Sequence, residues 1–150
     1  MQISRATSVP VFEQARDRVA LLGSSIVRDR VFRGIVLRAY GERCAITGLK
    51  LINGGGRAEV EAAHIRPVEH NGSDDVRNGL ALSGTVHWMF DRGLISLSDD
   101  LEVLVSRQAN NAGSIRSLIN PTGRARLPPS NHERPHPHFL RWHRENCFKA

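Results

Sequence analysis

A histidine and an aspartate stand four residues apart in the middle of the chain, His87 and Asp91. Residues 85–92 have the pattern of a short helix, and Gly93 directly after them is a typical helix stop. Residues at positions i and i+4 share one face of a helix, so this imidazole and this carboxylate can reach the same cation. The spacing therefore predicts a pair of metal ligands.

Two further polar residues precede this helix, His64 and Asn78. Residues 58–65 are predicted to form a strand that carries His64 near its end, and a second strand, residues 80–82, begins just after Asn78. This order of strand, loop, strand and helix can place His64 over the helix that carries His87 and Asp91. A phosphate could then lie between the His64 ring and a cation bound to that helix. An imidazole titrates near neutrality, so it can accept a proton from water at pH 7.

Each of these four residues also has a purely structural interpretation. His64 can be a histidine of the core, and Asn78 can be a turn residue because a glycine follows it. His87 can pack against the tryptophan beside it, and Asp91 can cap the helix or pair with the next arginine. Residue types alone leave these alternatives open.

The charges segregate along the chain. Residues 1–43 hold eight arginines against four acids, and residues 104–150 hold eight Lys or Arg against two acids. Residues 44–103 hold five Lys or Arg against nine acids, so a local charge of −4 lies between flanks of +4 and +6. Carboxylates suit a divalent cation and basic flanks suit a polyanion, although a mixed surface without function is the alternative.

Several basic residues are candidates for contacts with phosphate. Arg28, Arg30 and Arg33 lie on a predicted helix, and a solvated polar face is the commoner explanation for such arginines. Near the end of the chain, basic side chains either contact phosphate or pack the tail onto the core. The remaining candidates are Arg66, Arg141, His143 and Arg144.

Neither cysteine nor histidine spacing predicts a structural zinc site. Cys44 and Cys147 belong to no CxxC pair, so we expect reduced thiols. Prolines interrupt a cluster of histidines in the tail, which leaves no compact ligand set. The members of this cluster are His132, His136, His138 and His143. No apolar run is long enough to span a bilayer, so we expect a cytoplasmic protein without membrane contact.

The pattern of apolar residues predicts mixed α and β structure in one domain. A length of 150 residues with 40% hydrophobic residues fits one packed core. We expect helices at residues 11–22, 25–40, 85–92 and 139–148, and strands at residues 58–65, 80–82, 94–97 and 102–106. Residues 44–48 suggest a hairpin around the loop 53–56, and the stretch after residue 108 up to about residue 131 resembles an extended surface passage.

Four sequence blocks together resemble the HNH endonuclease family. They are CAITG at 44–48, EAAHIRP at 61–67, NGLAL at 78–82 and HWMFDRG at 87–93, and His64, Asn78 and His87 supply the ordered His, Asn and His. The nearest resemblance is to the HNH domains of modification-dependent restriction endonucleases. It extends to the tail, LRWHREN at 140–146, and covers roughly residues 28–148. Four blocks in the right order form a much stronger signal than one motif.

The resemblance implies an α+β fold with a ββα-metal core at residues 44–106. Helices at residues 1–43 would precede this core, and a basic extension at residues 107–150 would follow it, all within one nuclease domain. It also implies a DNA endonuclease or nickase that leaves 5′-phosphate and 3′-hydroxyl ends, with restriction, defence or a phage as the expected context.

The resemblance assigns a role to each of the four residues. His64 would be the general base, and Asn78 would hold its ring through the side-chain carbonyl. His87 and Asp91 would bind a divalent metal, with Mg²⁺ favoured and Mn²⁺, Ni²⁺ or Zn²⁺ also compatible with such ligands.

One position departs from the family pattern. Many HNH proteins carry an Asp or His ligand directly before the base, where this chain has Ala63. Glu61 lies on the same strand face, and either its longer side chain or a water molecule can take that place. The departure keeps open a degenerate HNH fold that binds nucleic acid without cutting it. A nuclease module that needs a homodimer or a partner subunit for target recognition is a third possibility.

Overall fold

The computed structural model describes residues 15–150, and it describes their side chains from residue 23 onward. It begins with one long helix, α1, Ala15–Ala39. We expected two helices, at residues 11–22 and 25–40; the start of the first lies outside the described residues. The predicted break is absent because a glycine inside a helix costs only about 1 kcal/mol and does not by itself end it. Gly41, with φ of +62°, follows the helix.

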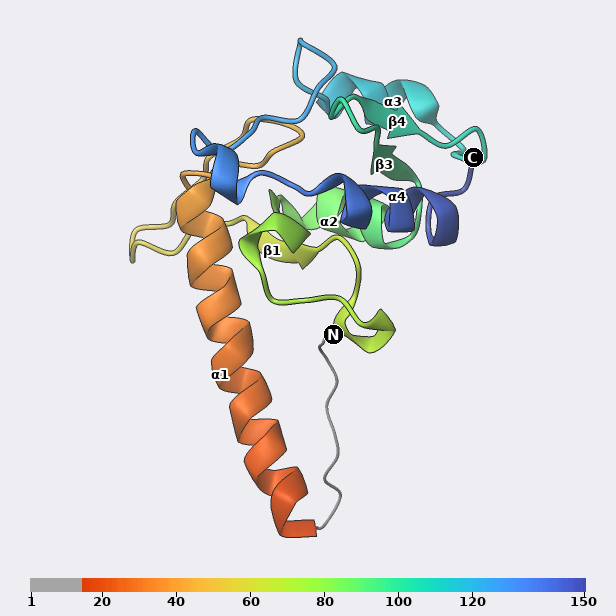
Figure 1. Cartoon of the computed structure of the whole chain (residues 1–150). Helices are drawn as coiled ribbons and strands as arrows, with labels where there is room; N and C mark the ends of the chain where they lie inside the picture. The colour runs from red at the N-terminus through yellow and green to blue at the C-terminus, as the bar shows by residue number, and fades with distance from the viewer. Residues whose placement is uncertain (1–14) are drawn as a thin grey trace.

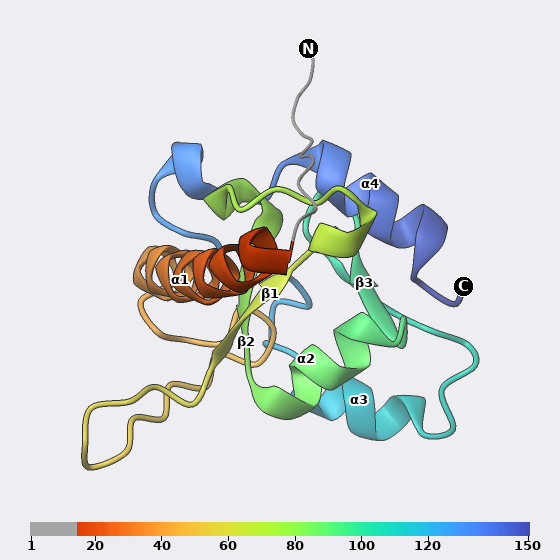
Figure 2. The same ribbon diagram turned by 90° about the horizontal axis from the view of Figure 1, so that it is seen from below.

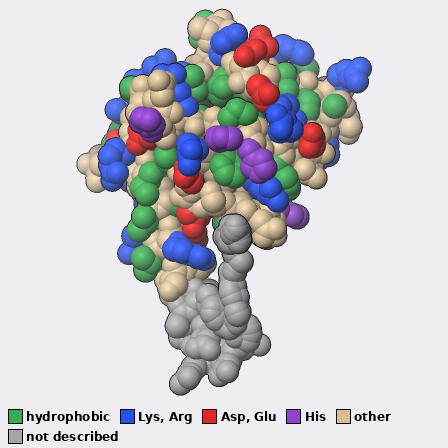
Figure 3. Space-filling view, in the orientation of Figure 1, with side chains coloured by type: hydrophobic (Ala, Val, Ile, Leu, Met, Phe, Trp, Pro, Cys, Tyr) green, Lys and Arg blue, Asp and Glu red, His purple; other side chains and the backbone are tan. Residues whose placement is uncertain are grey.

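Among the residues of α1 whose side chains the structure describes, those near its C-terminal end pack on the rest of the protein. Phe32, Val36 and Tyr40 are buried, whereas Val27 and Val31 are more than half exposed, at 56% and 54%. Figure 1 shows the N-terminal part of the helix projecting from the body, and Figure 3 shows hydrophobic side chains exposed along it. The expected apolar side of the helix is therefore buried only near its end.

A two-stranded antiparallel sheet follows, made of β1, Glu61–His64, and β2, Gly79–Leu82. In the register, His64 pairs with Gly79 and Glu61 with Leu82. Helix α2, Gly84–Asp91, comes directly after β2, and α1 packs against both strands. Two short 3₁₀ helices, Val68–His70 and Val76–Asn78, lie in the connection between the strands. The predicted order of strand, loop, strand and helix is confirmed.

The segment before β1 differs from the expected hairpin. Residues 44–48 form a turn in which the Gly48 amide donates to the Cys44 carbonyl, rather than a strand. Pairing occurs closer to the predicted loop, through a single bridge between Ile52 and Ala58. We call residues 50–57 the projecting loop, because they extend away from the body beside α1 (Figure 2).

A second sheet pairs β3, Ile95–Leu97, with β4, Val103–Val105, as the sequence predicted. The last helix, α4, Pro137–Asn146, packs against β3. Helix α3, Ala112–Leu118, was not predicted and replaces part of the expected surface passage. It buries only Ile115, so its sequence shows no helical periodicity of apolar residues. Beyond it, Asn120 donates to the Ala45 carbonyl and anchors this passage to the core.

The fold is of the α+β class, with helices around two small antiparallel sheets. Among the described residues, no helix is long and apolar enough to cross a membrane.

Candidate active site

His64 ends β1 with its ring fixed on two sides. The ring stacks on Phe32 of α1, with centroids 3.9 Å apart and planes 5° from parallel. Its Nε2 atom lies 3.0 Å from Oδ1 of Asp74, and 19% of the side chain is exposed. An ionised carboxylate only accepts hydrogen bonds, so Nε2 carries the proton in this pair and Nδ1 of a neutral ring is left as an acceptor.

Asp74 and Phe32 are the site residues that sequence reasoning missed. Asp74 adjoins Asp75, but Asp75 is already committed to Arg77, whose guanidinium lies 3.0 Å away and lowers the pKa of the Asp75 carboxyl. Two adjacent acids shortly before Asn78 were the available signal. Nothing in the sequence separates their roles, because only the path of the loop brings one of them to the His64 ring.

Asn78 is fully buried, but its side chain makes no hydrogen bond to the His64 ring, contrary to the expected role. Its Oδ1 accepts a hydrogen bond from the Arg66 amide at 2.9 Å. Its Nδ2 donates to the carbonyls of Arg66 and Ser73, at 3.0 and 2.8 Å. Asn78 thus closes the loop between β1 and β2, and this loop carries Asp74. Its influence on His64 is indirect.

Gly79 explains how α1 comes close enough to reach His64. A Cβ atom at this position would lie 2.5 Å from Cγ2 of Val36 and 3.1 Å from Cζ of Phe32. The Tyr40 hydroxyl donates to the Gly79 carbonyl at 3.0 Å. Any larger residue would push α1 away from β2, and with it the Phe32 ring that stacks on His64.

His87 lies between two carboxylates. Its Nδ1 is 2.6 Å from Oε1 of Glu61, and its Nε2 is 3.2 Å from Oδ2 of Asp91. The hydrogen bond to Asp91 raises the pKa of His87 to about 9; burial opposes this shift, and the bond to Glu61 reinforces it. At neutral pH and without a metal, His87 is therefore an imidazolium that bridges the two acids.

The His87 and Asp91 pair fits the geometry of two neighbouring metal ligands. Ligand distances of about 2.1 Å at right angles place two ligand atoms roughly 3 Å apart, close to the 3.2 Å between Nε2 and Oδ2. Glu61 contacts the other ring nitrogen, where it fits a carboxylate that orients the ring and does not fit a ligand of the same ion. Within the described residues, no cluster of three or more His, Cys, Asp or Glu side chains is arranged to hold a metal.

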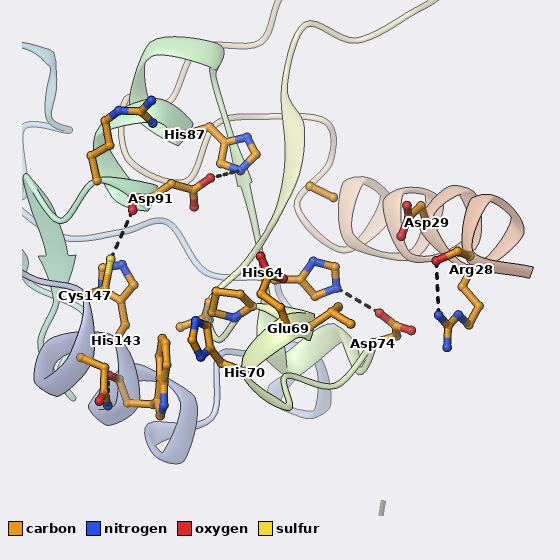
Figure 4. A pocket seen from close by; sticks show the side chains of 18 of the residues that line it. Arg28, Asp29, His64, Glu69, His70, Asp74, His87, Asp91, His143 and Cys147 are labelled. Atoms are coloured by element: carbon orange, nitrogen blue, oxygen red, sulfur yellow. Dashed lines mark hydrogen bonds and ion pairs between the residues drawn. The ribbon is translucent and has the colours of Figure 1, made fainter. Parts of the chain in front are cut away.

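One pocket of about 730 Å³ joins these groups (Figure 4). His64 and Asp74 line it together with His87 and Asp91, and Arg28 of α1 also contributes. Helix α2 is held at this wall by Glu59, whose carboxylate accepts hydrogen bonds from the Ser83 hydroxyl and the Gly84 amide, each at 2.9 Å. The His64 imidazole and a pair of potential metal ligands, His87 and Asp91, thus line the same space.

The arginines predicted to contact phosphate fall into two groups: those with exposed side chains, and those whose guanidinium is bound to other groups of the protein. Arg28, Arg30 and Arg141 are exposed. Arg33 donates to the Ala58 and Val60 carbonyls, and Arg144 binds the Leu97 carbonyl and Asp99. Arg66 donates to the His70 carbonyl, and its guanidinium lies over the ring of Trp142 at 5.4 Å.

His143 is corrected from a phosphate contact to a packing residue. It is 2% exposed, its ring stacks on Phe90 at 3.8 Å, and both nitrogens are occupied, by the Ser96 hydroxyl and the Phe90 carbonyl. Burial lowers the pKa of His143 to about 4. The alternative drawn from the sequence, that the tail packs onto the core, holds for this residue. Nearby, His136 caps α4 by accepting from the His138 amide.

Comparisons with known proteins agree with the resemblance seen in the sequence. Residues 44–98 match the family model described as HNH endonuclease. The chain is also similar to a solved structure, a modification dependent TagI restriction endonuclease, with 27% identity and a TM-score of 0.59. That similarity covers 75% of this chain and 36% of the other, so this chain spans about a third of the length of that protein. Among curated proteins, none matches the chain in sequence.

The resemblance to HNH endonucleases is therefore confirmed, and it supports a nuclease function in general terms. The matched segment contains β1, the 3₁₀ helix Val76–Asn78, β2 and α2, and with them His64, Asn78, His87 and Asp91.

Proposed function

We propose that this chain is a metal-dependent DNA endonuclease or nickase with a ββα-metal core formed by β1, β2 and α2. The observation that carries the proposal is the shared pocket, into which His64 and the His87 and Asp91 pair both open. The proposed nuclease domain comprises residues 1–150, as the sequence analysis expects, with α1 and the C-terminal segment around the core. The similarity to a restriction endonuclease supports DNA as the substrate.

In this proposal His64 accepts a proton from water at Nδ1. The Asp74 carboxylate holds the proton of the ring on Nε2, and the stack on Phe32 fixes the plane of the imidazole. The base therefore needs neither a change of tautomer nor a rotation before it acts. Asn78 would contribute by holding the loop that presents Asp74.

Nε2 of His87 and the carboxylate of Asp91 would hold the divalent cation, with Mg²⁺ favoured. When bound, the ion would neutralise the scissile phosphate and the departing 3′ oxygen. Glu61 would orient the His87 ring through Nδ1. Two protein ligands leave most positions around the ion to water and phosphate, so we expect weak metal binding in the absence of DNA.

The activity is tested by incubating the purified protein with supercoiled plasmid and a series of divalent ions. We expect nicked or linear DNA with Mg²⁺ or Mn²⁺, and no product when a chelator is present. DNA binding without any cleavage across the series would instead support a degenerate binding module. Cleavage without sequence preference would indicate that target recognition comes from a partner.

A further inference from the structure

A second hollow, on the side of α1 away from the candidate active site, is lined mainly by basic residues. It lies between α1 and the projecting loop and has a volume of about 650 Å³. We call it the basic groove, and among the described residues Glu42 is the only acid that lines it. Its basic residues are Arg30, Arg33, Arg38, Lys50 and Arg57.

The cations of this groove are not neutralised by the part of the protein that the structure describes. No ion pair among those residues involves Arg30, Arg38, Lys50 or Arg57, and all four are exposed. Other arginines differ: Arg77 pairs with Asp75 at 3.0 Å, and Arg144 with Asp99 at 2.8 Å. Gathering like charges without counterions is unfavourable, and a bound polyanion relieves the repulsion.

Two members of the groove hold positions that suit contact with a ligand. Arg33 is tied to the Ala58 and Val60 carbonyls, which fixes its guanidinium where α1 meets the strand region. Arg57 stands on the projecting loop, whose turn is ordered by Asn53: its Oδ1 accepts from the Gly55 and Arg57 amides at 2.8 and 3.0 Å. The loop extends away from the body of the protein (Figure 2), so the side chains of Lys50 and Arg57 take no part in packing the core.

The groove is linked to the candidate active site through Glu61, the residue bound to His87. A neighbouring hollow of about 440 Å³ shares Arg33 and Arg57 with it and reaches Glu61, the carboxylate bound to His87. Exposed apolar side chains of the loop, Leu51 and Ile52, line this passage. A chain of phosphates that extends from the candidate active site past Glu59 and Glu61, which also line this passage, would reach the basic groove beyond it.

We propose that the basic groove binds the sugar-phosphate backbone of duplex DNA beyond the phosphate that is cut. This inference rests on the proposed nuclease function for the identity of the polyanion. It assigns phosphate contacts to Arg38, Lys50 and Arg57, in addition to Arg30 and Arg33, which were already candidates from the sequence. Contacts of this kind fix the position of a duplex and carry no base specificity.

The test compares two triple variants of equal charge. The groove variant carries Arg38→Gln, Lys50→Gln and Arg57→Gln. The control carries Arg107→Gln, Arg116→Gln and Arg124→Gln, which are exposed and lie outside the groove. Binding of a fluorescent 30-base-pair duplex is followed by anisotropy in chelator at several salt concentrations.

We expect the groove variant to bind about tenfold or more weakly, and the slope of log K against log salt to shrink by about 2 to 3. The control should stay within about twofold of the parent. Equal loss in both triples, or no loss in the groove variant, would overturn the proposal. Displacement of the duplex by inorganic phosphate, but not by chloride at equal ionic strength, would also overturn it, because the groove would then hold a small anion.

Cleavage assays separate this inference from the proposed function. Bis(p-nitrophenyl) phosphate is too small to reach from the candidate active site into the groove, so the groove variant should hydrolyse it at the parent rate while cutting plasmid more slowly. Failure of the parent to cleave either substrate would reject the nuclease function. The binding data would still decide whether the groove binds duplex DNA. Equal plasmid cleavage by the parent and the groove variant would reject the proposed role of the groove in DNA binding, but not the nuclease function.

Discussion

The Nε2 atom of His64 lies 3.0 Å from Oδ1 of Asp74, and this carboxylate reaches the ring from the loop between β1 and β2. The contact leaves Nδ1 as the acceptor of the imidazole. The loop is in turn closed by buried Asn78. A histidine at a strand end thus has a defined tautomer because of a side chain ten residues later.

Asp74→Asn should reduce cleavage while preserving the fold. An amide can present either its oxygen or its NH₂ group to Nε2, so the tautomer of His64 is no longer fixed. We expect kcat for plasmid nicking to fall by about 10- to 100-fold with little change in KM. Unchanged kcat in a variant with a parental melting curve would show that Asp74 has no part in the reaction.

Asn78→Ala should act mainly on stability. It leaves the Arg66 amide and the carbonyls of Arg66 and Ser73 without their partner. We expect the free energy of unfolding in urea to drop by about 2–4 kcal/mol. Asn146→Ala removes an exposed bond to the Trp142 carbonyl and should cost less than about 1 kcal/mol. Loss of activity at unchanged stability in the Asn78 variant would instead favour direct action on the His64 ring.

Glu61 should affect metal binding less than Asp91 does. Glu61→Gln weakens the orientation of the His87 ring, and we expect a 10- to 100-fold loss of Mn²⁺ affinity by calorimetry. Asp91→Asn weakens a proposed ligand and should leave binding too weak to measure. If Glu61→Gln abolishes binding as fully as Asp91→Asn, Glu61 is itself a ligand and the assignment made from the geometry is wrong.

His143 should make the protein less stable in acid. Its pKa falls from 6.5 to about 4 on folding, so between these values the unfolded chain binds the proton more tightly. Stability is then complete above pH 6.5 and decreases as the pH falls, with a contribution of about 3 kcal/mol lost by pH 4. The difference in unfolding free energy between the parent and His143→Gln should shrink over this range. A constant difference would mean that folding does not shift the titration of His143.

Local pattern predicted much of the fold. β1, β2, α2 and the β3 and β4 pair were foreseeable, because each has its own alternation or periodicity of apolar residues. Helix α3 was not, since seven residues with one buried isoleucine carry no period. The continuity of α1 was missed: the sequence analysis separated residues 11–22 from residues 25–40, whereas the helix runs through Gly23, which a single glycine permits.

The candidate site was predictable in its residue types and less so in its contacts. His87 and Asp91 meet because helical spacing alone brings them together. The contact of Asp74 with His64 depends on how the connection at residues 65–78 closes, and the contact of Glu61 with Nδ1 of His87 depends on the angle between β1 and α2. The burial of His143 depends on where the tail packs. None of these relationships is encoded in local spacing.

The central claim is that His64 is the proton acceptor, and His64→Ala tests it most directly. Plasmid nicking with Mg²⁺ and duplex binding in chelator should be measured together, with His132→Ala as a control, since that exposed histidine lies outside the pocket. We expect nicking to fall by about 100-fold or more, duplex binding to stay within about twofold, and added imidazole to restore part of the rate. A well-folded His64→Ala protein that nicks DNA at the parent rate would contradict the account.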